Sequence, residues 1–533
     1  MLKKANIIDK FIEYVAPVKA MKRQYARTYM AVAGGYEGAD RTRRGLAGTK
    51  INIGDADANI LKDIKTLRGH SSDLIRNNPL AVGAINTNCT NVVGTGISLH
   101  SRIDRDVLGM GEEEADAWES NVEREWRLFS ETTECDISRT LNFSGIVKIA
   151  LRSVLEKGDT FVNMPFIARS GLSPYELRLQ LIEAERVCNK NNINDTPELI
   201  AGVEKTKDGA PKAYHVLNMH PGSYRLIQKQ QEWQRIPVYG SNSGRKNILH
   251  IFDPLRPGQT RGIPYLSPVI ESLYQLGRYT HSELMAAVLS SMMTFFLKSE
   301  RGSSIDLIPD INSNISGASD PALNYQTNDL ELGYGTAVGL PVGTSIDTTT
   351  PGRPNQAFDP FFNAIVRQIA VGLELPFEVL IKHFTASYSA SQAAMLDAYR
   401  TFTTRRKWLV DYLCMPVFEA FIEEAILKGR IYAPGFFVDP IIRQAYLKSQ
   451  WTGPAKAHID PLKEVEAAEK KIDIGLSTLQ DETVALTGGD WEKNHKQSVK
   501  EFNIRKKDGL ITEKVYSTKN PTSNNDKEDR DEV

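Results

Sequence analysis

Residues 255–273 read LRPGQTRGIPYLSPVIESL, and this stretch decides how the chain is organised. Proline and glycine in residues 257–262 set a tight turn. Ser267 followed by Pro268 is a favourable helix start, because serine can cap a helix and proline loses no hydrogen bond in its first turn. No further proline interrupts residues 268–298, so the pattern predicts one helix of 31 residues, roughly 45 Å long.

The segment after this helix has a different composition. Residues 301–358 contain seven glycines, five prolines and twelve serines or threonines, all of them turn-forming residues. A second, shorter helix is expected at residues 359–375, where Pro376 ends it. The order of helix, turn-rich segment and helix predicts a helical hairpin with a small module inserted at its tip.

Apolar periodicity predicts a mixed region before the hairpin. Apolar side chains recur every three or four residues over 112–129 and over 143–154, as on one face of a helix. From 177 to 181 the period is two, which predicts a half-buried strand; a turn at Asp208-Gly209 precedes a second predicted strand at 213–217. Residues 155–255 are therefore expected to be rich in strands and flanked by helices, and the predicted fold class is α+β.

Helical composition returns after the hairpin. Ser389 and Gln392 form a capping box, and the predicted helix continues to about residue 427 with a kink at Pro416. A further helical region is expected at 460–479. The polar residues 517–533 lack apolar periodicity and are expected to be disordered.

Composition bounds the class of protein. The 533 residues include 65 Lys plus Arg and 66 Asp plus Glu, an ordinary globular balance for two to four domains. Residues 1–50 carry eleven basic and four acidic residues, which favours contact with something acidic or, equally, a solvated terminus. The chain start lacks the apolar core of a signal peptide, no apolar run reaches the roughly 20 residues of a membrane helix, and four widely spaced cysteines are expected to be free thiols.

Catalytic and cofactor motifs are missing from the sequence. There is no GxxxxGK[ST] triphosphate loop, no HExxH, no GxSxG and no histidine pair at metal spacing. Gly94-Thr95-Gly96 is read as a turn, because Leu99 stands where a dinucleotide fingerprint needs its third glycine. We therefore predict no catalytic residue, no metal and no cofactor.

Six stretches of the chain carry a family resemblance: LIRNNPLAVGAI (74–85), NVVGTGISL (91–99), GMGEEEADAW (109–118), LRPGQTRGIPYLSPVIESL (255–273), TASYSASQAAMLDAYRTF (385–402) and HIDPLKEVEAAEKKIDIGLST (458–478). Together they resemble the lambda-like portal proteins of tailed bacteriophages. The resemblance implies a portal-type fold and a ring, usually a dodecamer, at one capsid vertex of the virion, through which double-stranded DNA is packaged and ejected. It also implies assembly in the host cytoplasm and contacts with the terminase packaging motor, the major capsid protein and head-tail connector proteins.

The resemblance also implies a division of the chain into the parts of a portal subunit. These are a basic N-terminal arm (1–70), a mixed α/β wing (71–264), stem helix one (265–300), a small α/β clip (301–358), stem helix two (359–381), a tunnel loop (382–390), a long wing helix (391–430), a helical crown (431–516) and a disordered tail (517–533).

Three groups of side chains are candidates for contact with DNA. The tunnel-loop group facing the channel is Lys382, His383, Phe384, Thr385, Ser387, Tyr388 and Ser389, although Phe384 and Tyr388 also suit core positions. The acidic group for the channel or clip surface, which would keep DNA from binding tightly, is Asp306, Asp310, Asp320, Asp329, Glu331, Asp347, Asp359 and Glu374. The basic group is Arg405, Arg406 and Lys407, equally read as a solvated helix face.

Two other functions fit parts of the sequence. A packaging nuclease or ATPase subunit would need a triphosphate loop, which is missing, or clustered metal-binding carboxylates, which one sequence cannot group. A capsid-associated adaptor or scaffold without a pore would use the basic arm alone. We predict a structural portal subunit and no enzyme.

Overall fold

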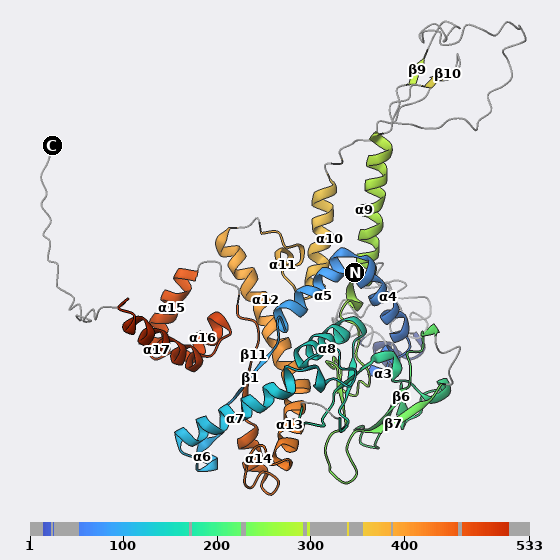
Figure 1. Ribbon diagram of the computed structural model, residues 1–533. Helices are drawn as coiled ribbons and strands as arrows, with labels where there is room; N and C mark the ends of the chain where they lie inside the picture. The colour runs from blue at the N-terminus through green and yellow to red at the C-terminus, as the bar shows by residue number, and fades with distance from the viewer. Residues whose placement is uncertain are drawn as a thin grey trace, which may run out of the picture. The chain divides into compact units, whose positions relative to one another are not determined.

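The computed structural model describes residues 14–22, 25, 53–169, 173–224, 231–291, 296–298, 338–340, 355, 357–384, 387–456 and 461–510 (Figure 1). The chain divides into two units, residues 1–59 and residues 60–533. In the first unit, residues 17–22 are helical.

The described residues form helices and strands in the mixed order of an α+β fold. The helices are α3 (Ala56–Ile60), α4 (Ile64–Asn77), α5 (Pro79–Val92), α6 (Arg105–Leu108), α7 (Glu112–Ser130), α8 (Phe143–Lys157), α9 (Ile270–Ser291), α10 (Phe358–Gly372), α11 (Phe377–Ile381), α12 (Tyr388–Leu409), α13 (Met415–Leu427), α14 (Pro440–Leu447), α15 (Pro461–Asp473), α16 (Leu479–Thr487) and α17 (Trp491–Lys507).

The strands of the described residues pair in small sheets. One sheet has the order β3 (Gln180–Glu183), β2 (Thr160–Asn163), β8 (Ile248–Ile251), and another has the order β4 (Leu199–Ile200), β5 (Val203–Lys205), β6 (Pro211–Leu217), β7 (Trp233–Pro237). Two further pairs are β1 (Ser98–Ser101) with β11 (Ser449–Thr452), and β9 (Phe296–Lys298) with β10 (Val338–Leu340).

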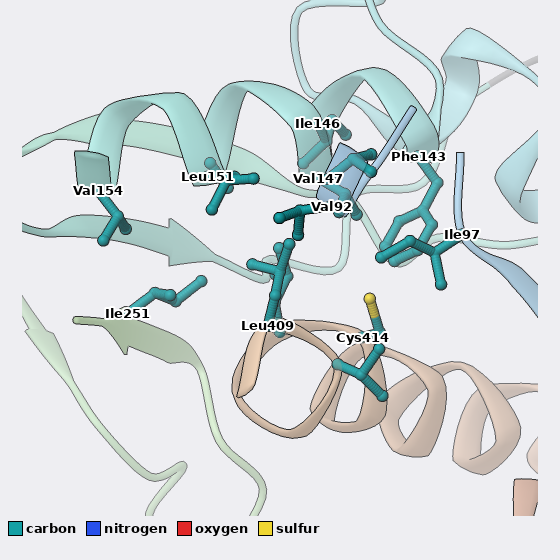
Figure 2. Packing of buried hydrophobic residues seen from close by; sticks show 14 of the residues in the cluster. Val92, Ile97, Phe143, Ile146, Val147, Leu151, Val154, Ile251, Leu409 and Cys414 are labelled. Atoms are coloured by element: carbon teal, nitrogen blue, oxygen red, sulfur yellow. The ribbon is translucent and has the colours of Figure 1, made fainter. Parts of the chain in front are cut away.

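The main core forms where α5, α7 and α8 meet the helices that follow residue 388. Figure 2 shows the part of this core in which Leu151 of α8 and Val92 of α5 lie near Leu409 of α12. The predicted stripe of α7 is buried, and Trp126 at its centre makes edge-to-face ring contacts with Phe143, Phe418, Phe421 and Trp451. Aromatic rings prefer this geometry. Both helices predicted from apolar spacing, α7 and α8, are therefore confirmed.

A second, smaller core lies between the two larger sheets. The predicted turn before β6 is confirmed: Gly209 has φ +83, and β5 and β6 pair as an antiparallel hairpin around it. The expectation of a half-buried strand over 177–181 is wrong in one respect, because Arg178 is only 1% exposed. Only residues from Gln180 onward join the regular ladder, and Leu177 and Leu179 make isolated bridges.

The predicted helical hairpin is present as α9 and α10, which lie side by side (Figure 1). Tyr279 of α9 stacks on Phe358 of α10, with ring centroids 5.7 Å apart. In α9, Leu276 is buried and none of the positions 277–288 is. In α10, none of the positions 358–365 is buried, and Val366 is the first buried residue. Each helix is therefore anchored in the core at one end and exposed at the other.

Two details of α9 differ from the prediction. Residues Ser267–Val269 form a 3₁₀ turn before the helix, and the Ser267 hydroxyl caps nothing. The helix ends at Ser291, and residues 296–298 form strand β9, parallel to β10. The continuous helix expected to residue 298 is thus wrong at its end, because Phe296–Lys298 pairs with a strand more than 30 residues away, a contact that local composition does not encode.

The long helix after the hairpin also starts and bends differently. Ser387, two residues before the expected Ser389, caps α12 and accepts a hydrogen bond from the Ala390 amide at 3.4 Å. A π-helical turn at Val410–Cys414 precedes Pro416 in place of a kink at the proline. Proline has no N–H for the preceding turn, and a widened turn is one way to absorb that loss. Farther on, α15 ends at Asp473, short of the predicted 479.

Candidate functional site

Residues 382–387 connect α11 to α12, and Tyr388 and Ser389 of the predicted tunnel loop lie in the first turn of α12. Lys382 caps the end of α11, its positive φ of 56° turns the chain, and the His383 amide donates to the Glu378 carbonyl at 3.1 Å. Lys382, His383, Phe384, Ser387, Tyr388 and Ser389 are all exposed, and Thr385 lies outside the described residues. The Lys463 ammonium lies 5.8 Å from the centre of the Tyr388 ring, so α15 reaches this segment.

A cleft of about 830 Å³ lies between α10, α11 and α12. Charges of both signs line it: Arg367, Arg400 and Arg405 face Asp253, Glu374 and Asp397. Arg405 lies 3.5 Å from the Glu374 carboxylate and 4.5 Å above the Tyr265 ring. This mixture of charges offers no strongly acidic or basic site.

Of the eight acidic candidates, the structure describes two. Asp359 lies in the first turn of α10 and Glu374 follows its last turn, and both are exposed. Glu374 is paired with Arg405, as described above. The other six lie outside the described residues: Asp306, Asp310, Asp320, Asp329, Glu331 and Asp347.

The three basic candidates on α12 do not form one exposed cluster. Arg406 is 8% exposed, and its guanidinium donates to the carbonyl oxygens of Asn91, Val92 and Pro454 at 2.7–3.0 Å. Burial lowers its pKa. Lys407 is exposed and pairs with Asp411. The description of a basic, solvated face is therefore wrong for Arg406, which joins α5, α12 and the segment after β11 inside the fold.

The base of α9 is held by a buried cluster that the sequence did not reveal. Asp159 has no exposed surface, and its carboxylate accepts from Arg261 and Arg68, with the His250 ring nitrogen 3.3 Å away. Burial alone would raise its pKa, but the two guanidinium groups hold the pKa well below its usual range. Burial also lowers the pKa of Arg68 to about 10 and lowers that of His250.

The motif PGQTRG at 257–262 is explained by this cluster. The side-chain oxygen of Gln259 accepts from the Leu255 amide at 2.9 Å, and its nitrogen donates to the Arg261 carbonyl at 2.8 Å. The Gly262 amide donates to Asp159 at 3.2 Å, and a Cβ at Gly262 would lie 1.9 Å from the Gly158 carbonyl oxygen. The motif therefore locks the chain entering α9 against β2. In the sequence, only Gly158 and the PGQTRG motif hinted at this close contact, because glycines allow two backbones to approach. No sequence pattern indicates that Arg261 pairs with Asp159.

Over the ranges that the structure describes, no group of three or more histidine, cysteine, aspartate or glutamate side chains is arranged to hold a metal ion. None of the helices there is long and apolar enough to cross a membrane. The four cysteines are free, and Cys89, Cys135 and Cys414 are buried; burial raises the pKa of Cys135 to about 12.

The α+β fold with its anchored helical hairpin agrees with the predicted class of protein, a structural component of a phage particle. Residues 42–406 match the family described as phage portal protein, lambda family, and the chain belongs to this family. It is 29% identical over 468 residues to portal protein B of Escherichia phage lambda, covering 85% of this chain and 86% of that protein. It is 28% identical over 506 residues to the portal protein of Escherichia phage N15, covering 92% and 93%.

Solved structures give a weaker likeness. The neck of an empty GTA particle contains a chain that is 13% identical, with a TM-score of 0.40, covering 84% of this chain and 98% of that one. The neck of a native GTA particle gives a TM-score of 0.36 at 11% identity, covering 83% of this chain and 97% of that one. Likeness at this level supports no inference. The family membership rests on the sequence match alone.

Proposed function

We propose that this chain is the subunit of a homo-oligomeric ring, a dodecamer at one capsid vertex, whose central channel passes double-stranded DNA during packaging and ejection. The observation that carries the proposal is the family match over residues 42–406, which includes the helical hairpin and the 382–389 segment. The outer halves of α9 and α10 support the role of a stem, since none of the described positions 277–288 and 358–365 is buried in the core.

The 382–389 segment supports a channel-facing loop. Its described side chains are exposed, and serine residues suit brief contacts with phosphates that read no base sequence. A lining rich in lysine and arginine would displace counterions and hold DNA tightly. The described part of the site has no such excess of basic residues, because acids including Glu374 balance its arginines, and Asp359 adds an exposed acid on α10; this charge balance would let the duplex slide.

The partners follow from this proposal. ATP hydrolysis for packaging would come from a separate terminase motor, because the sequence contains no triphosphate loop. The clip at 301–358 would contact that motor and later the head-tail connector proteins, and the wing would contact the major capsid protein. Assembly would take place in the host cytoplasm, and the chain would act without enzyme activity of its own.

Imaging of the purified chain tests the proposal. Negative-stain images are expected to show rings with a central hole, and light scattering is expected to give a mass of many subunits. Solid particles would favour a pore-less adaptor. A stable monomer, or hydrolysis of ATP or DNA by the purified chain alone, would overturn the proposal.

The loop itself can be tested in assembled particles. Shortening residues 383–388 is expected to leave ring formation intact and to reduce the length or retention of packaged DNA. A matched control shortens the exposed turn at 241–244, which lies between β7 and β8. If both deletions leave packaged DNA unchanged, the loop does not face the channel.

A further inference from the structure

The helix α17 has no buried side chain along its 17 residues. Its first turn is held by ion pairs, with Lys493 3.0 Å from Glu123 of α7 and Glu492 3.4 Å from Arg102. Beyond that turn every residue to position 510 is exposed. Helices of this length gain most of their stability from packing an apolar face, and α17 has no such buried face among the residues that the structure describes.

One face of α17 is suited to packing. Trp491, His495, Val499 and Phe502 recur at spacings of four, four and three, which places them along one stripe. Val499 is 46% exposed and Phe502 is 51% exposed. Lys496 and Arg505 flank this stripe, and residues 491–507 contain six basic and two acidic residues. The free face of the helix is therefore apolar with a basic border.

A groove of about 450 Å³ lies between α15 and α16, and only Asn494 of α17 lines it. Its apolar side chains include Val465 and Leu479, which are 57% and 48% exposed. Glu469 and Asp473, one turn apart on α15, are exposed at its border. Residues 461–487 contain six acidic and three basic residues. The groove thus has an apolar floor and an acidic border.

We propose that the apolar stripe of α17 docks in the α15–α16 groove of a neighbouring copy of this chain. The two surfaces match in apolar character and are opposite in charge, and the exposed fractions above show that neither covers the other within one chain. An amphipathic helix seated in an apolar groove is a common mode of recognition. Because the two surfaces differ, the contact is head-to-tail, and such contacts close into rings when the rotation allows. The inference rests on the ring proposed above and names one of its interfaces.

Cysteine cross-linking tests the docking directly. The variant carrying Val465→Cys and Phe502→Cys is expected to give, under mild oxidation, a covalent ladder that extends beyond the dimer on a non-reducing gel and collapses on reduction. The matched control pairs Val465→Cys with Gln497→Cys, which lies about 140° around α17 from Phe502, and is expected to give no ladder.

Charge reversal tests the match between the borders. Adding Glu469→Lys and Asp473→Lys to the cross-linking variant is expected to abolish the ladder at low salt. Adding Lys496→Glu and Arg505→Glu as well is expected to restore it. Restoration would not follow from a mere folding defect in the first variant.

The outcomes separate this inference from the proposed function. A mass of many subunits by light scattering without a ladder, an intramolecular cross-link, or an equal ladder in the Gln497→Cys control would overturn the docking and leave the ring standing. A monomeric mass for the unmodified chain would overturn both.

Discussion

Arg261 and Asp159 form a doubly bonded ion pair that water does not reach: Nε lies 2.6 Å from Oδ2 and Nη2 lies 3.1 Å from Oδ1. Arg261 also donates to the carbonyl oxygens of Ala184, Val187 and Ala201, at 2.6–2.8 Å. One side chain thus joins the entry to α9 with both larger sheets. A force applied along α9 would be transmitted to the sheets through these bonds.

Loss of this arginine is expected to destabilise the fold. Arg261→Ala leaves the Asp159 charge facing only Arg68 and His250, and removing one partner of a buried pair costs about 3–5 kcal/mol. The control Arg235→Ala removes an exposed arginine bound to Glu204 and should cost about 0–1 kcal/mol. Urea unfolding of both variants measures the difference; equal losses would show that the buried pair has no special weight.

Stability is expected to fall in acid in two steps. Burial lowers the folded-state pKa of His100 and of His250, so the unfolded chain binds more protons below its histidine pKa of about 6.5. Stability from these groups is complete above that pH and declines below it, by up to about 1.4 kcal/mol per pH unit for each histidine. Asp159, whose pKa is also lowered in the fold, adds a second loss as the pH falls below its unfolded value of about 3.9.

The variant His100→Gln separates the two steps. It removes one titrating group of the first step, so the unfolding free energy should fall less steeply between pH 6.5 and 5. The step below pH 4 should remain, since Asp159 is unchanged. Urea unfolding measured across this pH range checks both, and an unchanged slope above pH 5 would contradict the assignment to His100.

Helices could be predicted from the sequence where the spacing of apolar residues directly reflects which face of the helix is buried. The stripe around Trp126 repeats every three or four residues because that face of α7 is buried, so α7 and α8 were predictable, as were the α9–α10 hairpin and the exposure of the residues next to Ser387. Buried charge was not predictable. Arg261 and Arg406 are buried because their partners come from distant parts of the chain, and local spacing carries no record of such partners. Arg178 is buried although its side chain donates to the neighbouring Leu177 carbonyl.

The glycine at 262 is expected to tolerate no side chain. Gly262→Ala places a Cβ against the Gly158 carbonyl, which is backbone and cannot move aside; we expect a loss of about 3 kcal/mol or more, the upper range for overpacking. The control Gly69→Ala lies in α4 with nothing within 4 Å of the new Cβ and should stabilise by up to about 1 kcal/mol. Thermal unfolding of the two variants should therefore shift in opposite directions, and a shift in the same direction would contradict the close approach.

Arg406 and Lys407 are neighbours in sequence with opposite expected behaviour. Arg406→Ala removes the donor from three carbonyl oxygens, one buried and two partly buried, and should cost about 1–3 kcal/mol. Lys407→Ala loses an exposed pair with Asp411 and should cost less than about 1 kcal/mol. The alternative is that the two residues bind DNA together. In that case both variants would weaken DNA binding by purified rings to the same extent and would leave the free energy of unfolding unchanged. Denaturation and DNA-binding titrations on the same preparations distinguish these results.

The acidic lining predicted for the channel can be tested at Asp359, in the first turn of α10. Asp359→Lys replaces an exposed acid by a base in every subunit, so the ring should hold duplex DNA more tightly, with affinity that falls more steeply as salt rises. Glu113→Lys is the control, because Glu113 is also exposed in the first turn of a helix, α7, and carries the same cost against the helix dipole. Filter binding of duplex DNA to purified rings at several salt concentrations provides the measurement. A steeper salt dependence for Asp359→Lys alone supports a lining position, whereas equal changes in both variants would mean that DNA meets the outer surface and that Asp359 does not face the channel.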